Sequence, residues 1–513
     1  MQLNRRNFLF GTAAVATLAG CSTSKANAQV IPPRTLKPGE KRAVAMIGIG
    51  IQGRGLLKSF LAQPNVRVVA ICDVDKTRRE DSAATVDKYY KDGSKCETYF
   101  DFRDVLKNPG IDAVCIATPD HWHAYISVEA MKHGKDVYCE KPLTFSIDES
   151  KKVMAAQKTY GRVFQTGSMQ RSWPVFRTAA SLVRGGVIGD IKYVDANYGR
   201  GGQKLGGPSH PIRFWDVPEN AAKESEGYEL LGEEGWNMWL GPAKWRPYSN
   251  QLAPVGVNKF YPMFWRFDDD IGSGYNGDWG AHHLDIAQWG MDMDDSGPYK
   301  IIRSDEPYSK DLYHGGRRQF GMKMLFKSKK GGDIELYHGP FGVWGTVFYG
   351  TNGIVAVNRG KIAVWVGFDA TAKKPDEAIR KGLQDVTYMK DKIVAESVGK
   401  DYGTDSEDKK DNRLDAALKL LNEKYAAEIK RANLYVSHNQ IQNFCECLDS
   451  RKMTISPSEV GGRSCTLCLL CNMSYVYDTG FDWDPVKMEI VGANPKGIST
   501  KREVYRNGWD IVV

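Results

Sequence analysis

The chain has 513 residues, which is enough for two or three domains, and its 42% hydrophobic and 26% charged residues are ordinary for a globular protein. This composition excludes a disordered or fibrous protein. The formal net charge is +8, but no basic block with interleaved aromatic residues occurs along the chain, so nucleic acid is not an expected partner.

The N-terminus is typical of a protein that is exported in its folded state. Arg5 and Arg6 form a twin-arginine pattern, and the apolar stretch 8–20 is too short to span a bilayer. Leu18–Cys21 resembles a lipobox, which predicts an exported lipoprotein on the periplasmic face that touches the membrane only through a lipid anchor at Cys21. A plain signal-peptidase site at Ala26–Ala28 is the alternative, and the choice of inner or outer membrane stays open.

Short apolar runs and helical patterns then divide the chain into two domains. In the first, the runs alternate with helical stretches, which favours βαβ units in a parallel sheet; they are Val66–Asp73, Ala113–Thr118, Val137–Glu140 and Gly161–Thr166. A helix over Val175–Arg184 leads to a second set of runs that lie too close together for crossover helices, so we expect an open, mainly antiparallel sheet; they are Ile191–Tyr198, Phe320–Phe326, Ile334–His338 and Lys361–Val366.

The predicted fold class is therefore α/β, with an N-terminal Rossmann domain and a C-terminal α+β domain. The expected boundaries are a signal peptide at 1–20, a tether at 21–40, the dinucleotide-binding domain at 41–166 and the substrate and oligomerisation domain at 167–513. A stretch dense in Lys, Asp and Glu at about 371–432 predicts an inserted surface helix pair with a solvated face.

A glycine-rich turn between two apolar runs predicts the cofactor. Gly48 permits a tight turn, Gly50 lets the backbone approach a pyrophosphate, and Gly53 lets helix and strand pack closely. Asp73 ends the second run 20 residues after Gly53, where an acid holds a ribose diol. This spacing predicts NAD, whereas Arg78–Arg79 keeps NADP open as the less favoured cofactor.

Two further polar segments follow strand ends, where ligands bind in open α/β sheets. Thr118–His123 follows one predicted strand and Glu140–Pro142 closes the next, so both are expected at the cofactor crevice. Lys141, held beside a nicotinamide ring, could serve in proton transfer. A solvated turn is the alternative for Glu140–Pro142 taken alone.

The segment 277–289 carries the strongest acid–base pattern of the second domain. Asp278 and His282 are four residues apart, so on a helix they share one face and can act on one proton. A metal site with His283 and Asp285 is the rival interpretation, but the His-x-x-x-His pair that binds zinc is absent, so no metal is expected.

Two clusters leave their roles open. The aromatic stretch with Trp215, Trp236, Trp239, Trp245 and Trp265 is rich in Gly and Pro, which predicts irregular structure; its rings suit either stacking on sugars or a core. The spacing Cys465-x-x-Cys468-x-x-Cys471 resembles the start of an iron–sulfur motif, but its apolar neighbours favour small hydrophobic residues on a buried helix. The odd number of cysteines left after Cys21 argues against a disulfide framework.

Taken in order, these motifs resemble the glucose-fructose oxidoreductase and inositol dehydrogenase (Gfo/Idh/MocA) family, over roughly 41–370 and 433–511. Within it, Trp236–Pro242 and the C-terminal tail look most like an exported, twin-arginine lipoprotein branch. The resemblance implies reversible hydride transfer between a nicotinamide ring and a hydroxyl-bearing carbon of a sugar or polyol. It also implies a homo-oligomer that assembles through the open sheet, and the charged stretch 371–432 lies outside it.

The resemblance implies a role for each matching residue. Lys141 would hydrogen-bond the reacting hydroxyl, His282 would be the general base and Asp278 would orient substrate or base; the neighbouring His283 leaves the identity of the base open. The cofactor-binding set would be Gly48, Gly50, Gln52, Gly53 and Arg54 along the pyrophosphate, Asp73 on the adenosine ribose, and Thr118, Pro119, His121, His123, Glu140 and Lys141 near the nicotinamide half.

Export adds a constraint, because no free NAD pool exists outside the cytoplasm and the cofactor should stay bound between turnovers. The expected protein is an NAD-dependent oxidoreductase of sugars or glycosides, with oxidation at carbon 3 as one outcome within the family. An NAD-dependent glycosidase that works by oxidation and elimination is one alternative. A non-catalytic sugar-binding lipoprotein that keeps only the fold is the other.

Overall fold

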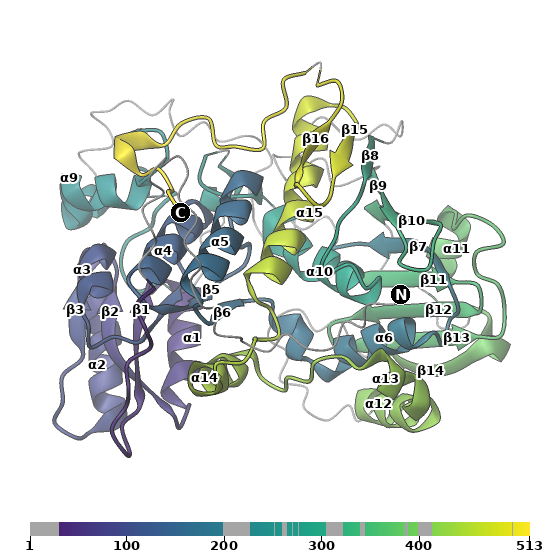
Figure 1. Cartoon of the computed structure of the whole chain (residues 1–513), viewed down its shortest axis with the longest axis horizontal. Coiled ribbons are helices and arrows are strands. Elements are labelled where there is room, and N and C mark those ends of the chain that lie inside the picture. Colours follow the sequence, from purple (N-terminus) through teal and green to yellow (C-terminus); the bar gives the residue numbers. More distant parts are fainter. Residues whose placement is uncertain are drawn as a thin grey trace, which may run out of the picture.

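The computed structural model describes residues 30–198, 226–250, 252–258, 264–268, 270–274, 276–303, 322–338, 344–383, 385, 388–398, 413–494 and 496–513 (Figure 1). The signal peptide, Cys21, most of the tether and Trp215 lie outside these residues. Within them, no helix combines the length and the apolar character needed to cross a membrane.

The first domain is a six-stranded parallel sheet of the Rossmann type. Its strand order is β3-β2-β1-β4-β5-β6, which places β1 and β4 side by side at the point where the order reverses. The strands are β1 (Arg42–Ile47), β2 (Val66–Cys72), β3 (Glu97–Tyr99), β4 (Ala113–Ile116), β5 (Asp136–Cys139) and β6 (Phe164–Thr166). The predicted parallel sheet is therefore confirmed, and β3 is a strand that the sequence pattern did not predict.

Helices cover both faces of this sheet because the strand residues are apolar on both sides. Val44 and Met46 face one core and Ala45 and Ile47 face the other, as the alternation of a strand requires. The helices are α1 (Ile51–Leu61), α2 (Lys76–Tyr90), α3 (Phe102–Lys107), α4 (Asp120–Lys132) and α5 (Ile147–Tyr160). Helix α14 (Gln440–Ser450) joins the same core as α1, so a segment near the C-terminus returns to the first domain.

The second domain is built on a ten-stranded, mostly antiparallel sheet, as predicted. The order is β14-β13-β12-β11-β7-β10-β9-β8-β15-β16, and the pair β7–β10 is parallel. The strands are β7 (Ile191–Ala196), β8 (Lys300–Arg303), β9 (Met322–Lys327), β10 (Asp333–His338), β11 (Thr346–Gly350), β12 (Gly353–Asn358), β13 (Lys361–Val366), β14 (Ile393–Val398), β15 (Phe481–Asp484) and β16 (Glu489–Val491).

One face of this sheet packs on helices, of which α10 and α15 lie between the two domains (Figure 1). Val355 and Val364 point into the core that contains residues of α6 (Pro174–Gly185), α10 (Ala281–Gly290) and α15 (Ser458–Tyr477). Cys465, Cys468 and Cys471 are buried on α15, which fits the interpretation as small core residues.

The chain itself covers part of the opposite face. Ile354 and Trp365 alternate with the residues above and pack with Leu383, close to α11 (Glu377–Gly382). Buried Asp195 of β7 accepts two hydrogen bonds from Arg380 of α11, at 2.8 and 3.0 Å. This part of the sheet is thus packed within one chain, and the predicted assembly through the open sheet stays a prediction for the remaining strands.

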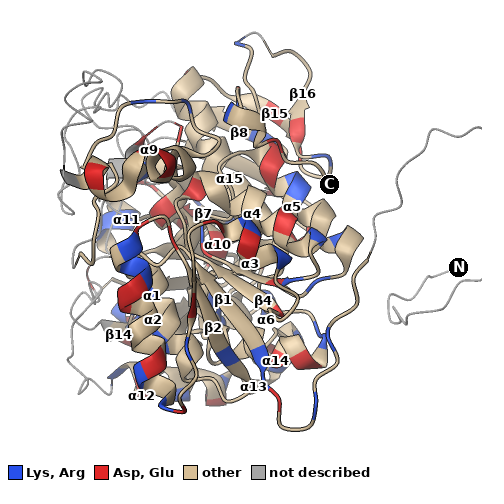
Figure 2. Ribbon diagram, turned by 90° about the vertical axis from the view of Figure 1, so that its left-hand side faces the viewer, with Lys and Arg blue, Asp and Glu red and all other residues tan. Residues whose placement is uncertain are grey.

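Two segments differ from the sequence-based expectation. Residues 226–240 form helix α9 (Glu226–Leu240), with a break at Gly232, where an irregular segment was predicted; buried Trp236 packs in a local core that stabilises the helix. In the charged stretch, α12 (Arg413–Lys424) and α13 (Ala426–Ala432) form a helix pair on α6, but β14 also adds a strand to the sheet. Figure 2 shows acidic and basic residues interspersed on the helices of both domains.

A buried ion pair connects the two domains. Arg171 lies in the 3₁₀ turn Met169–Ser172 that follows β6, and Asp285 lies on α10; each is 1% exposed. The guanidinium donates to both carboxylate oxygens of Asp285 at 2.8 to 3.0 Å and also contacts Asp294. Asp285 is therefore engaged by a structural arginine.

Asp285→Asn is expected to lower the free energy of unfolding by roughly 3–5 kcal/mol, because it leaves part of a buried charge uncompensated. The measurement is the midpoint of thermal unfolding of the purified protein. Glu80→Gln is the matched control, since Glu80 forms an exposed pair with Lys76 at 3.7 Å and should leave the midpoint unchanged. Equal midpoints for the two variants would contradict the structural role of Asp285.

Candidate active site

A single cavity of about 1330 Å³ runs from the glycine loop of the first domain to the sheet of the second. It exceeds the 300–1,000 Å³ that is typical of sites for one small ligand, so it has room for a dinucleotide and a second molecule. The predicted site residues that line it are Gly48, Gly50, Gln52, Asp73, Thr118, Pro119, His123, Glu140, Lys141, Asp278 and His282. The others, Gly53, Arg54 and His121, lie outside the lining.

The glycine loop fits a dinucleotide pyrophosphate. A Cβ at Gly48, where φ is +81°, would lie 2.7 Å from the Thr118 backbone nitrogen, and one at Gly53 would lie 2.2 Å from the Gly48 carbonyl oxygen. A Cβ at Gly50 would meet nothing within 4 Å, so this residue faces open space at the N-terminus of α1. The first N–H groups of α1 have no side-chain cap and are available to a phosphate.

Asp73 and two arginines define the ribose end. The Asp73 carboxylate accepts hydrogen bonds from the backbone nitrogens of Ile49 at 2.8 Å and Asp75 at 2.9 Å, which fixes it beside the glycine loop. Arg78 donates to the carbonyl oxygens of Pro254 and Gly256, and Arg79 donates to the carbonyl oxygen of Asp73. Both arginines that kept NADP open therefore contact backbone oxygens.

Residues 236–250 and 252–258, which follow the first domain in the chain, form a roof over this end of the cavity. Trp239 and Leu252 line the cavity opposite Phe100 of the first domain. His121 and the indole nitrogen of Trp122 both lie 3.1 Å from the carbonyl oxygen of Trp239. His121 thus contacts the roof, and Arg54 likewise donates to the carbonyl oxygen of Asn258; a role of either residue in binding the cofactor stays a prediction.

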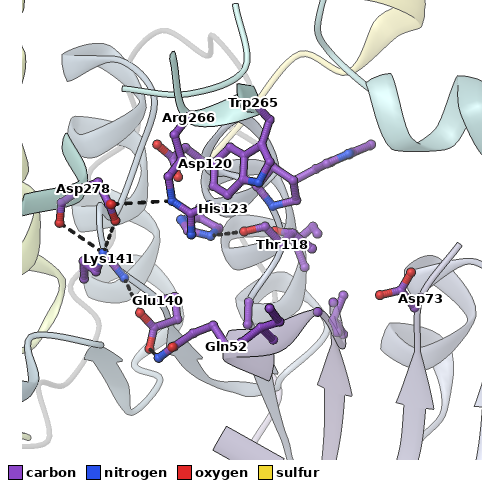
Figure 3. Close-up of a pocket in the computed structure, with 18 of the residues that line it drawn as sticks. Gln52, Asp73, Thr118, Asp120, His123, Glu140, Lys141, Trp265, Arg266 and Asp278 are labelled. Atoms are coloured by element: carbon purple, nitrogen blue, oxygen red, sulfur yellow. Dashed lines mark hydrogen bonds and ion pairs between the residues drawn. The ribbon is translucent and has the colours of Figure 1, made fainter. Parts of the chain in front are cut away.

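The strand ends place polar groups at the middle of the cavity (Figure 3). The hydroxyl of Thr118 is buried there and has no hydrogen-bond partner among the described residues, so it can bind a ligand. Both ring nitrogens of His123 contact carbonyl oxygens, of Pro142 at 2.8 Å and Thr118 at 2.9 Å, which fixes the ring. Glu140 accepts a hydrogen bond from Gln52 at 3.1 Å, and burial raises the pKa of its carboxyl group.

Lys141 and Asp278 form an ion pair across the two domains (Figure 3). The Lys141 ammonium lies 2.7 Å from the Asp278 carboxylate and 3.1 Å from its carbonyl oxygen, and Arg266 lies 3.6 Å from the other carboxylate oxygen. Burial alone would raise the pKa of Asp278, but the charges of Lys141 and Arg266 outweigh it and lower the pKa to about 2. Asp278 is thus a carboxylate that orients Lys141 and is a poor proton acceptor.

The two neighbouring histidines occupy different environments. His282 lines the cavity on α10, directly after the π-helical turn Asn276–Gly280 that carries Asp278. His283 is turned away from the cavity lining and its ring stacks on Tyr198 and Trp279. Burial, with the charges of Arg359 and Lys141, holds the pKa of His282 well below 6.5, so its imidazole is uncharged and able to accept a proton.

The residues of the rival metal interpretation lie in separate surroundings. Asp285 pairs with Arg171 and His283 stacks on aromatic rings, so neither lies beside His282 in the cavity. Across the part of the chain that the structure describes, no three His, Cys, Asp or Glu residues are placed to hold a metal ion.

Sequence reasoning missed several residues at the far end of the cavity. They are Asp120, Met169, Trp173, Arg266, Trp279, Arg359 and Leu414. Trp279 and Asp120 sit inside the motifs already singled out, and their positions beside Asp278 and His121 were the available signal. No sequence signal indicated Arg359 or Leu414. Arg359 reaches the cavity through the pairing of β12 with β13, and Leu414 reaches it through the packing of α12 on α6.

The fold and the glycine loop define a dinucleotide-binding Rossmann protein. Comparison with known proteins narrows this class further. A family model described as an oxidoreductase family with an NAD-binding Rossmann fold matches residues 42–168. The chain is 34% identical over 150 residues to inositol 2-dehydrogenase from Rubrobacter xylanophilus, covering 28% of this chain and 41% of the relative. It is 28% identical over 253 residues to a glycosyl hydrolase family 109 protein from Stenotrophomonas maltophilia, covering 48% and 50%.

These matches span about half or less of the length of the curated relatives. Among solved structures, an NAD-binding protein from Listeria innocua has a TM-score of 0.50 at 16% identity, covering 86% of this chain and 97% of that chain, which shows similarity of fold alone. The first domain of this chain is thus similar to the NAD-binding Rossmann domain of this oxidoreductase family over residues 42–168.

Asp73→Ala is expected to weaken NAD binding roughly 10- to 150-fold, because the ribose diol loses a charge-assisted hydrogen bond of about 1.5–3 kcal/mol. The measurement is calorimetric titration of cofactor-free protein with NAD and with NADP. Asp92→Ala, at an exposed acid that pairs with Arg67 away from the cavity lining, serves as the control. Tighter binding of NADP than of NAD by the unmodified protein would overturn the role given to Asp73.

Proposed function

We propose that this protein is an exported NAD(H)-dependent oxidoreductase that transfers hydride between the nicotinamide and a hydroxyl-bearing carbon of a sugar or glycoside. The observation that supports it most is that Lys141, Asp278 and His282 line the same cavity as the glycine loop. The relative named inositol 2-dehydrogenase supports a substrate with ring hydroxyl groups. A sugar-binding lipoprotein would not need this proton-transfer set.

The residues divide the proton chemistry between them. Lys141, fixed by Asp278, donates a hydrogen bond to the oxygen of the reacting hydroxyl. His282 takes the hydroxyl proton because its imidazole is held uncharged in the cavity. NAD supplies the hydride acceptor. The side chains of Lys141 and Asp278 are only 15% and 18% exposed, so their charges are screened less by water than they would be at the surface.

A second candidate function is an NAD-dependent glycosidase, and the relative named glycosyl hydrolase family 109 protein favours it. Oxidation at carbon 3 acidifies the neighbouring position, so the same Lys141 and His282 could begin an elimination of the glycosidic oxygen. The two functions are distinguished by whether an aryl glycoside releases free phenol without any partner enzyme.

Lys141→Met and His282→Ala should keep the fold and the bound NAD but slow the hydride step about 10²–10⁴-fold, the usual contribution of positioned acid–base groups. Asp278→Asn should slow it less, by about one to two orders of magnitude, because it orients Lys141 and moves no proton. The measurement is single-turnover reduction of bound NAD by a glycoside, followed near 340 nm.

His283→Ala is the matched comparison, since this ring packs beside the catalytic one without lining the cavity. It should react near the unmodified rate once folded protein is isolated. An inactive His283→Ala with a normal His282→Ala would move the base by one residue. Normal rates in both would make the segment from Asp278 to Asp285 structural and refute the mechanism.

Export and lipidation are part of the same proposal and rest on the N-terminal sequence. The cofactor should be retained after export, and the roof formed by residues 236–250 and 252–258 supports this because Arg78 and Trp122 tie it to the first domain. A sugar substrate and a second substrate would then exchange at the other end of the cavity. A homo-oligomer remains our expectation.

Cys21→Ser should release the protein from the membrane fraction, because one acyl-bearing cysteine is the only predicted anchor. Fractionation followed by mass spectrometry of the mature N-terminus is the measurement, and Cys96→Ser is the control because it leaves the lipobox intact. An unlipidated mature chain that begins at Gln29 would show that the anchor is absent.

A further inference from the structure

The charged insertion reaches the cavity, although the sequence predicts a solvated surface feature there. Leu414, in the first turn of α12, lines the same cavity as Lys141 and His282. Its side chain is half-buried and packs against the main core, whereas Leu420 on the same helix is 46% exposed. The first turn of α12 therefore forms part of the cavity wall, whereas Leu420, further along the helix, lies at the protein surface.

The wall around Leu414 comes from three separate segments. Helix α12 packs on α6, and Trp173 is the residue that precedes α6 and also lines the cavity. The turn between β12 and β13 adds Arg359 and Gly360. These elements lie on the side of the second domain, whereas the glycine loop belongs to the first.

Arg359 joins this wall to the catalytic residues. Its guanidinium carbon lies 4.7 Å from the ring centre of Trp279 and 5.5 Å from that of Trp173. Its Nε donates to the side-chain oxygen of Gln170 at 3.0 Å, and the Gln170 amide nitrogen donates to the main-chain oxygen of His282 at 3.2 Å. The wall is thus continuous with the place where the reacting hydroxyl would lie.

The chemistry of the wall suits a ring beyond the reacting one. An indole, a leucine and an arginine held over indole rings offer flat and apolar surfaces, which suit contact with sugar rings and aromatic groups. If only a single sugar ring were bound, held by Lys141 and His282, water would fill this end of the cavity. Its apolar side chains would then stay in contact with water, which is unfavourable.

We propose that Trp173, Arg359 and Leu414 form a second subsite that binds the aglycone or the next sugar ring, so that the substrate is a glycoside and not a free monosaccharide. This inference rests on the proposed function and names its substrate class. The insertion that supplies Leu414 then sets substrate length, and the catalytic residues are left unchanged.

The test compares free hexoses and hexosamines with their phenyl glycosides, one matched pair at a time. Equilibrium binding to the NAD-loaded protein is followed by tryptophan fluorescence, and NAD reduction is followed separately. For at least one pair, the unmodified protein should bind the glycoside more tightly. Leu414→Ala should weaken glycoside binding roughly five- to tenfold, about 1–1.4 kcal/mol, and leave the monosaccharide unchanged.

Leu414→Trp fills the subsite and should block the glycoside while the monosaccharide still binds. Leu420→Ala, on the exposed side of the same helix, should change neither ligand. Equal binding of both members of every pair, no binding of any pair, or equal losses for both ligands in Leu414→Ala would overturn the subsite. Selective binding of a glycoside without NAD reduction would leave the subsite standing and refute the proposed reaction.

Discussion

The position of α10 against the first domain is the constraint on which the site depends. Gln170 and Arg171, in the turn after β6, hold the His282 carbonyl and the Asp285 carboxylate, and Lys141 after β5 holds Asp278. All three contacts join strand ends of the parallel sheet to one helix and the turn before it. Arg171 and Asp285 are buried and neutralise each other, so a shift of α10 would leave two unpaired charges in the core. The distance between the base and the glycine loop is therefore fixed by the core of the molecule.

The same arrangement separates the two acid–base groups electrically. Asp278 lies between Lys141 and Arg266, so its charged form is favoured, while His282 lies near Arg359 and Lys141, so its charged form is disfavoured. Positive neighbours, together with burial of the imidazole, thus favour the deprotonated state of both groups, which is charged in the carboxylate and neutral in the imidazole. A carboxylate with a pKa of about 2 is a weak base, and this leaves the imidazole as the acceptor.

Local patterns predicted most of the first domain, because βαβ units and a glycine turn depend on neighbours in sequence. Gly48, Gly50 and Asp73 line the cavity, as their spacing in the sequence predicted. Thr118 and Lys141, at the strand ends, line it as well. Contacts between distant segments were not predictable in this way. Helix α9 forms in a Gly-rich stretch because Trp236 finds a local core, and α14 completes the first domain from more than 300 residues away. The motif around His121 could not show that its ring contacts the Trp239 carbonyl oxygen and lies outside the cavity lining.

Arg78 shows why cofactor preference needs both the motif and the fold. An arginine soon after the acidic residue is the pattern that accommodates a 2′-phosphate. Here the carbonyl oxygens of Pro254 and Gly256 accept its N–H donors, and Asp75 lies 3.5 Å from its Nε. Turning this side chain toward a phosphate would break those bonds and release the roof at the ribose end. The contacts that hold the roof at the ribose end are thus the contacts that withhold Arg78 from a phosphate, so the proposed retention of the cofactor and a preference for NAD would have one structural cause.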